Sequence, residues 1–197
     1  MRYEKGHKAA TRQRIMAVAS RRFRDEGISA VGLAAVMSDA GLTNGAFYAH
    51  FDSKEDLVRQ VIEHEVEDQR TSLEAAAADG GLERVFREYL NAAHRDLRAE
   101  GCPSAALLDE ITRRPLATRD AYTQRLLDLI DAVARYLDRD DPDRARVDAL
   151  VIFGSLVGTL QLSRAITDPD ISEKILERGV DAAMTLADAS ATPARDR

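Results

Sequence analysis

Residues 33–57 read LAAVMSDAGLTNGAFYAHFDSKEDL, and this stretch decides the fold predicted for the amino-terminal part of the chain. Two short segments with helical spacing of apolar residues, 33–40 and 43–49, meet at Gly41. A glycine there supplies the positive φ that a tight corner between two helices needs. Thr43 stands where a side chain would cap the second helix. The pattern predicts a helix-turn-helix, although two short helices around a glycine also occur in enzymes and helical bundles.

The two faces of these short helices differ in polarity. Apolar side chains at helical spacing are expected to bury the inner faces: Val36, Ala40, Leu42, Phe47 and Phe51. Five residues remain for the outward rim of the second helix: Thr43, Asn44, Ala46, Tyr48 and His50. A helix whose first residues carry small side chains can enter the major groove of DNA closely. The rim is therefore a candidate DNA-binding surface.

The rest of the chain also has helical periodicity, and no stretch alternates as a strand would. A helix over residues 7–26 is expected to stop at Gly27, and a longer one over 53–78 begins with a capping-box pattern at Ser53. Four prolines each stand where a new helix would begin: Pro103, Pro115, Pro142 and Pro169. Further helices are predicted over 82–99, 103–113, 115–138, 142–166 and 170–189. The fold class is therefore all-α, with about nine helices.

The charge is distributed unevenly along the 197 residues, whose net charge is −6. Residues 1–24 hold eight Lys and Arg against one Glu, whereas the residues after position 60 hold 18 basic and 27 acidic side chains. A basic amino end on an acidic body is typical of a chain with one domain that meets a polyanion and one that does not. A tail that is basic without any such partner would give the same charge pattern.

Several classes of protein find little support in the composition. One cysteine excludes a disulfide framework within the chain, and four dispersed histidines make a metal site improbable. The longest uncharged run, residues 149–163, is shorter than the roughly 18 residues that would span a bilayer. There is no phosphate-binding glycine loop and no nucleophile elbow. We therefore expect a cytoplasmic protein that is not an enzyme, has no cofactor and no metal, and does not enter a membrane.

The run AGLTNGAFYAHFDSKEDL at residues 40–57 resembles the TetR/AcrR family of bacterial transcriptional regulators, together with the amphipathic first helix and the turn at Gly27. The family pattern is Gly-apolar-[Ser/Thr]-x-Gly-x-[Phe/Leu]-Tyr-x-[His/Tyr]-Phe-x-[Ser/Asn]-Lys-Glu-x-Leu. Twelve residues satisfy it: Gly41, Leu42, Thr43, Gly45, Phe47, Tyr48, His50, Phe51, Ser53, Lys54, Glu55 and Leu57. The resemblance covers about residues 8–60, and the rest of the chain is compatible in length and helical pattern only.

This resemblance implies a homodimer with two kinds of domain in each chain. Residues 1–52 would form a three-helix DNA-binding domain, and residues 53–197 a larger helical domain for ligand binding and dimerisation. The recognition helix would be 43–50. In the family, the positions of Thr43, Tyr48, His50 and Lys54 touch phosphates, and those of Asn44, Gly45 and Ala46 approach bases. Asn44 stands where many members have Lys, so either one phosphate contact is missing or one base contact is added.

The two carboxyl-terminal segments are candidates for the dimer interface. The helix over 142–166 is apolar almost all round and carries Gly154 and Gly158, which would let a partner helix approach closely. The helix over 170–189 has one apolar face. Two such helices per subunit favour a four-helix bundle between subunits, although they could also complete the core of one chain. Cys102, at the predicted start of a helix, is more often an inert residue than a redox sensor.

The leading hypothesis is a ligand-responsive transcriptional regulator, a repressor released from a near-palindromic DNA operator by a small-molecule effector. One rival is an all-α dimeric small-molecule-binding protein or enzyme whose basic amino end is incidental. Another is an architectural DNA-binding protein without an effector. The sequence does not identify the effector, the ligand-binding residues, the operator or the regulated genes, and it does not separate repression from activation.

Overall fold

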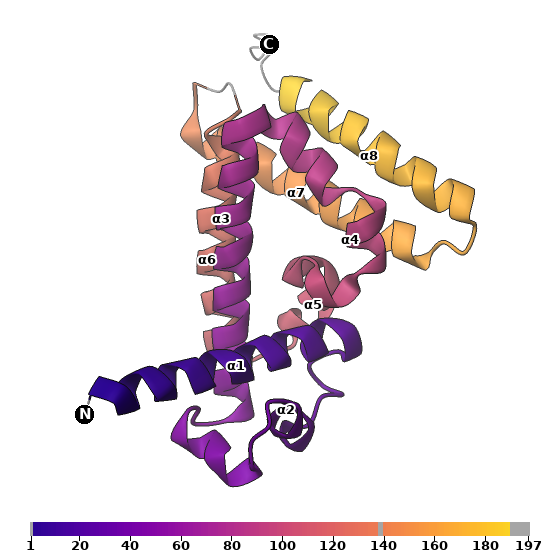
Figure 1. Cartoon of the computed structure of the whole chain (residues 1–197). Helices are drawn as coiled ribbons and strands as arrows, with labels where there is room; N and C mark the ends of the chain where they lie inside the picture. Colours follow the sequence, from indigo (N-terminus) through magenta and orange to yellow (C-terminus); the bar gives the residue numbers. More distant parts are fainter. Residues whose placement is uncertain (1, 138–139, 190–197) are drawn as a thin grey trace. The chain divides into compact units, whose positions relative to one another are not determined.

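The computed structural model describes residues 2–137 and 140–189, and every regular element in these ranges is a helix (Figure 1). The described residues form two compact units. The first unit is Met1–Val66 with Arg98–Gln124, and the second is Glu67–Leu97 with Arg125–Arg197. The expectation of an all-α chain with about nine helices is confirmed, because the structure has eight α-helices, one of which is divided by a kink, and two short 3-10 helices in the described ranges.

The first unit holds the predicted helix-turn-helix. It contains α1 (Arg2–Glu26), α2 (Leu33–Asp39), the 3-10 helix η1 (Asn44–Ala49) and the beginning of α3 (Lys54–Tyr89). It also contains η2 (Arg98–Glu100), α5 (Pro103–Thr112) and the beginning of α6 (Leu116–Ala134). Helix α1 contacts α2, η2 and α5. Its buried residues Ile15, Ala19 and Phe23 recur every four residues, so they line one face of the helix.

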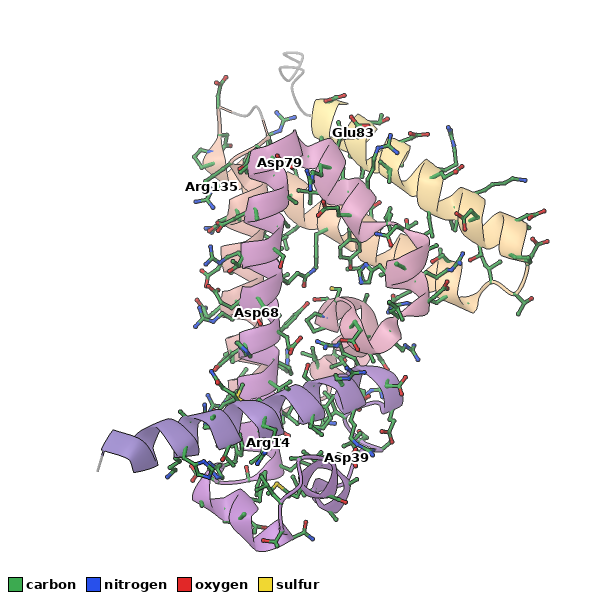
Figure 2. All side chains as sticks on the ribbon, in the orientation of Figure 1. Arg14, Asp39, Asp68, Asp79, Glu83 and Arg135 are labelled. Atoms are coloured by element: carbon green, nitrogen blue, oxygen red, sulfur yellow. The ribbon has the colours of Figure 1, made fainter. Side chains whose placement is uncertain are left out.

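The second unit contains the remainders of α3 and α6 with α4 (Ala92–Asp96), α7 (Pro142–Ala165) and α8 (Pro169–Ala189). Helices α7 and α8 lie side by side over most of their length (Figure 1). Asp141 caps α7 by accepting the N–H groups of Asp143 and Arg144, and Pro142 occupies the first turn, where no amide donor is needed. In the same unit Arg135, labelled in Figure 2, pairs with Glu74 at 2.6 Å.

Three predicted helices end or wind differently in the structure. The continuous helix expected over 82–99 is wrong: α3 ends at Tyr89, because the backbone of Asn91 is extended and its side chain caps α4 by accepting the N–H of His94. The segment predicted over 43–49 is a 3-10 helix over 44–49 rather than an α-helix. The helix predicted over 115–138 ends as α6 at Ala134. The predicted stop at 79–81 is confirmed by the kink at Gly80 and Gly81 within α3.

Helix α7 is, among the described residues, the one helix whose length and apolar composition would allow it to cross a membrane. The uncharged run of 149–163 was expected to be too short for that, but the whole helix has 24 residues, and a stretch of 18 of them is apolar with at most two charged side chains. The observation is weak, because the core helix of a soluble protein meets the same criteria. One face of α7 is buried within the second unit, where the helix packs along α8.

A candidate nucleic-acid interface

The corner between α2 and η1 has the geometry that the sequence predicted. Gly41 has φ +67°, in the left-handed region that favours glycine. Its N–H donates to Ser38 O at 2.9 Å, and the N–H of Leu42 donates to Met37 O at 2.9 Å, so the last carbonyl groups of α2 are satisfied within the turn. The chain therefore leaves α2 in a fixed direction and enters η1 at Asn44, two residues after Leu42.

Aromatic packing holds η1 against the core of the first unit. Phe47 and Phe51 are buried, and their rings stack with centroids 5.5 Å apart. Val36 and Ala40 of the predicted inner face are buried as well, whereas Leu42 is half-buried. Because the inner face is packed in this way, the opposite face of η1 must point outward.

The outward face carries the residues expected to contact DNA. Thr43, Asn44 and Gly45 are exposed, Ala46 is half-buried, and the Tyr48 side chain is 70% exposed. Thr43 occupies the N-cap position, but its side chain makes no capping hydrogen bond. The prediction that the Thr43 side chain caps the helix is therefore wrong, and its hydroxyl makes no hydrogen bond to the start of η1.

Neither the backbone conformation nor the packing of the described residues requires glycine at position 45. Unlike Gly27 and Gly41, it does not have a positive φ, and a Cβ built on it meets no atom of the described residues within 4 Å. Glycine inside a helix costs about 1 kcal/mol relative to alanine, so the position carries a cost that the fold of the chain does not explain. A close approach by another molecule would explain it.

His50 lies at the end of η1 beside two cations of α1. Burial lowers the pKa of the His50 imidazole below its usual value, and the charges of Lys8 and Arg12 lower it further. Its Nδ1 is buried without a hydrogen-bond partner among the described residues. The Arg12 guanidinium lies over the Phe51 ring, 5.1 Å from the centroid. Sequence analysis did not identify Lys8 and Arg12 as site residues, although both are basic and one helical turn apart.

Lys54, unlike the exposed residues predicted to contact DNA, makes a side-chain hydrogen bond within the first unit. It is half-buried, and its Nζ donates to the carbonyl of Ile28 at 2.7 Å. Burial lowers the pKa of the Lys54 ammonium and the charge of Arg114 lowers it further, against the opposing effect of Glu110 and Glu55. An ammonium has three donors, and one of them is used inside the unit.

An ion pair between helices keeps α2 close to α1. Arg22 of α1 donates to Asp39 at the end of α2 at 2.6 Å, and also to Glu26 of its own helix at 2.6 Å (Asp39 is labelled in Figure 2). Exposed pairs of this kind contribute little stability singly. Their effect here is to orient α2, which in turn sets where the Gly41 corner and η1 lie.

Residues 15–61 match the model of a family described as bacterial regulatory proteins, tetR family. The chain is 43% identical over 53 residues to the HTH-type transcriptional regulator AcrR of Shigella flexneri; this match covers 27% of the chain and only a quarter of the relative's length. Three solved structures share the fold over nine-tenths of the chain. NemR of E. coli in its reduced form has a TM-score of 0.72 and 18% sequence identity, and the match covers 89% of this chain and 96% of NemR. A TetR-family regulator from Agrobacterium tumefaciens has a TM-score of 0.73 and 19% identity, with 89% of this chain and 98% of that chain covered. FadR of Bacillus subtilis in complex with stearoyl-CoA has a TM-score of 0.64 and 15% identity, with 91% of this chain and 98% of FadR covered.

Proposed function

Because this chain belongs to the TetR/AcrR family of bacterial regulators, we propose that it is a DNA-binding transcriptional regulator that responds to a small molecule and acts as a repressor. In this proposal residues 1–52 are the DNA-binding domain, and residues 53–197 bind the ligand and form the dimer. The protein works in the cytoplasm, where its operator is, and needs no cofactor or catalytic residue.

The observation that carries the proposal is the outward face of η1. Exposed small and polar residues follow a sharp, well-packed corner, and Gly45 leaves open space where any other residue would place a side chain. Such an element can reach the floor of a major groove without a clash. We assign the base contacts to Asn44, Gly45 and Ala46. The phosphate contacts are assigned to Thr43, Tyr48, His50 and Lys54, and Lys8 and Arg12 add positive charge beside His50.

Asn44 and Lys54 should affect binding in different ways. Asn44 is exposed at the first position of η1, and its amide can both donate to and accept from adenine. Asn44→Ala should therefore cost roughly 1–3 kcal/mol per half-site on the operator and little on a scrambled duplex. Lys54→Gln should weaken both duplexes alike and lower the salt slope by about one unit per site. Titrations of both duplexes at two salt concentrations measure this. Equal losses on both duplexes for Asn44→Ala would assign Asn44 to phosphate contact.

His50 should make DNA binding depend on pH. In the free protein its lowered pKa favours the neutral ring, and a phosphate placed among His50, Lys8 and Arg12 would offset the cations and raise that pKa. Binding would then take up a proton, so affinity should rise as the pH falls from about 7.5 to about 6, by up to about tenfold per pKa unit gained. His50→Gln should flatten this dependence, and His64→Gln, an exposed histidine of α3, should not. A slope that survives in His50→Gln would exclude His50 as its source.

The proposed homodimer uses the faces of α7 and α8 that the second unit leaves uncovered. Val147, Val151 and Leu162 of α7 are each more than half exposed, and with Gly154 and Gly158 they follow one stripe of the helix. On α8, Ile171 is more than half exposed and Leu186 is partly so. Large apolar side chains in a contiguous stripe are typical of a surface that another chain covers. A near-palindromic operator would match the two-fold symmetry of such a dimer.

The proposed ligand acts through the carboxyl-terminal domain. One similar structure, FadR of Bacillus subtilis, was solved with stearoyl-CoA, and this supports a ligand site in the corresponding helices here. A ligand can release DNA only by binding more tightly to a conformation that fits the operator poorly. The structure assigns no pocket residue to this ligand.

A labelled-duplex shift assay with the DNA that flanks the coding region tests the proposed function directly. We expect a shifted complex at nanomolar protein, competed by unlabelled duplex but not by a scrambled one. A screen of small molecules should then find one that releases the complex. Failure to bind any flanking duplex would favour a small-molecule-binding protein or enzyme, and binding that no ligand releases would favour an architectural DNA-binding protein.

A further inference from the structure

The turn between α1 and α2 is held by a side chain from a distant part of the same unit. Glu110, near the end of α5, accepts hydrogen bonds from the backbone N–H of Ile28 at 3.0 Å and of Ser29 at 2.9 Å. It also accepts the hydroxyl of Ser29 at 2.8 Å. The acceptor is 81 or 82 residues away in the sequence from these donors. The turn is therefore bonded through its donors to α5.

Gly27 shows how closely this carboxylate approaches the backbone. Gly27 has φ +89°, and a Cβ built on it would lie 2.6 Å from Glu110 Oε1. A side chain at position 27 would therefore be strained and would also displace the carboxylate. Gly27 was predicted only as the stop of the first helix, and the structure adds that it makes room for Glu110.

Other charged groups complete the contact between the turn and the helices around it. The carbonyl of Ile28 accepts from Lys54 of α3, and the N–H of Ser29 in the same peptide group donates to Glu110, so both sides of this peptide group are bonded to other helices. Arg114 donates to the Ser29 hydroxyl at 3.0 Å and lies 3.6 Å from Glu110 Oε2. Burial alone would raise the pKa of the Glu110 carboxyl, but the hydrogen bonds from Ser29 and Ile28 and the charge of Arg114 lower it overall. The carboxylate is thus ionised at neutral pH.

An ionised carboxylate suits this position because it only accepts hydrogen bonds. Three donors of the turn converge on its two oxygens, and no other common side chain of this size offers acceptors alone. Hydrogen bonds to a charged acceptor are shorter and roughly twice as strong as neutral ones. Removing the charge would leave backbone donors of a partly buried turn facing a poorer acceptor.

We propose that Glu110 is a positioning residue for DNA recognition, which ties α5 to the turn between α1 and α2 and so fixes where α2 and η1 present their outward face. This role rests on the proposed function, since its effect is on the reading of an operator. Glu110 contacts no DNA. It acts through Ile28 and Ser29, whose backbone leads directly into α2.

Glu110→Gln is the variant that tests the assignment. The amide would turn an NH2 group toward one of the donors, so at least one hydrogen bond is lost without changing the size of the side chain. We expect amide hydrogen exchange at Ile28 and Ser29 to become about tenfold faster or more, which reports the opening of the turn. Operator affinity should fall about tenfold, with a smaller fall on a scrambled duplex, so the ratio of the two affinities drops. A variant that merely unfolds part of the protein would lower both affinities together.

Asp109→Asn provides the matched control, because Asp109 is the neighbouring acid on α5, is 78% exposed and pairs with Arg113 on the surface. It should leave the exchange rates and both affinities at wild-type values. If Glu110→Gln fails to fold, Ser29→Ala removes one of the three hydrogen bonds at an exposed residue, and exchange at position 29 should still rise.

Two results would overturn the assignment. Wild-type exchange at both amides in folded Glu110→Gln would mean that the carboxylate does not hold the turn. Faster exchange with an unchanged ratio of operator to scrambled affinity would mean that the turn does not position the recognition element. A wild-type protein that binds no duplex at all would instead refute the proposed function, and the exchange measurement would still decide whether Glu110 holds the turn.

Discussion

Gly154→Leu is expected to convert a dimer into a monomer and to lower operator affinity by about 100-fold or more. Gly154 is exposed on the stripe of α7 that carries Val147, Val151 and Leu162, and a Cβ built on it meets no atom within 4 Å in the part of the chain that the structure describes. The added side chain therefore has room within one chain and would clash only with a partner helix packed against α7. A monomer holds a single half-site, and the affinity gained by linking two half-sites is about 10² to 10⁴. Light scattering at micromolar protein and titration of the operator measure the two effects.

Gly154→Ala is the control for this prediction. Alanine favours the helix by about 1 kcal/mol and adds only a methyl group, so we expect a stable protein with weaker but detectable dimerisation. The thermal unfolding of isolated Gly154→Leu chains should resemble that of wild-type monomers at high dilution. A wild-type protein that is monomeric at micromolar concentration and still binds the operator tightly would show that α7 and α8 do not form the proposed interface.

Gly45→Leu is expected to abolish operator binding, by about 100-fold or more, while the protein stays folded. Position 45 is exposed, its φ is not positive, and no atom of residues 6–137 and 140–189 lies within 4 Å of a built Cβ, so these residues leave room for a side chain there. In the proposed complex the same space is taken by the edges of the bases, and a leucine would hold η1 away from the groove floor. A loss of 100-fold corresponds to about 2.7 kcal/mol, which is the scale of one or two lost base contacts.

The stability of the Gly45 variants separates this effect from misfolding. Gly45→Ala and Gly45→Leu should both unfold at or above the wild-type temperature, because each residue favours a helical backbone more than glycine does. Scrambled-duplex affinity should fall less than operator affinity, since phosphate contacts at the rim of the groove are longer-ranged. Operator binding at wild-type strength by Gly45→Leu would place η1 outside the DNA interface.

The helix-turn-helix could be predicted closely from the sequence because its signals are local. Gly41 was expected to take a positive φ, and it does, because glycine adopts the left-handed conformation of a tight corner without the steric cost of a Cβ. Phe47 and Phe51 were expected to be buried from their spacing, and they are. The prediction of an α-helix over 43–49 was wrong, because the segment forms a 3-10 helix. Over six residues the two kinds of helix place apolar side chains on nearly the same face, so the spacing does not distinguish them.

The functional assignment of single residues was less predictable. Tyr48 and Asn44 are exposed as expected, but Lys54, predicted for a phosphate, also bonds to Ile28, and Lys8 and Arg12 were not identified beside His50. A basic residue has the same pattern in sequence whether it faces DNA, solvent or a backbone carbonyl. Only the surroundings of the side chain distinguish these cases.

By itself, the sequence determined the all-α class, the place of the helix-turn-helix and the polarity of its faces, because these depend on spacing within one or two helical turns. The tertiary structure alone decided that Glu110 holds the turn at Ile28 and Ser29, and that Gly45 faces open space while Gly27 faces a carboxylate. Periodicity reports which face of a helix is buried, but not which distant element covers it. Contacts between residues 80 positions apart arise from the packing of whole helices, and no local pattern encodes their partners.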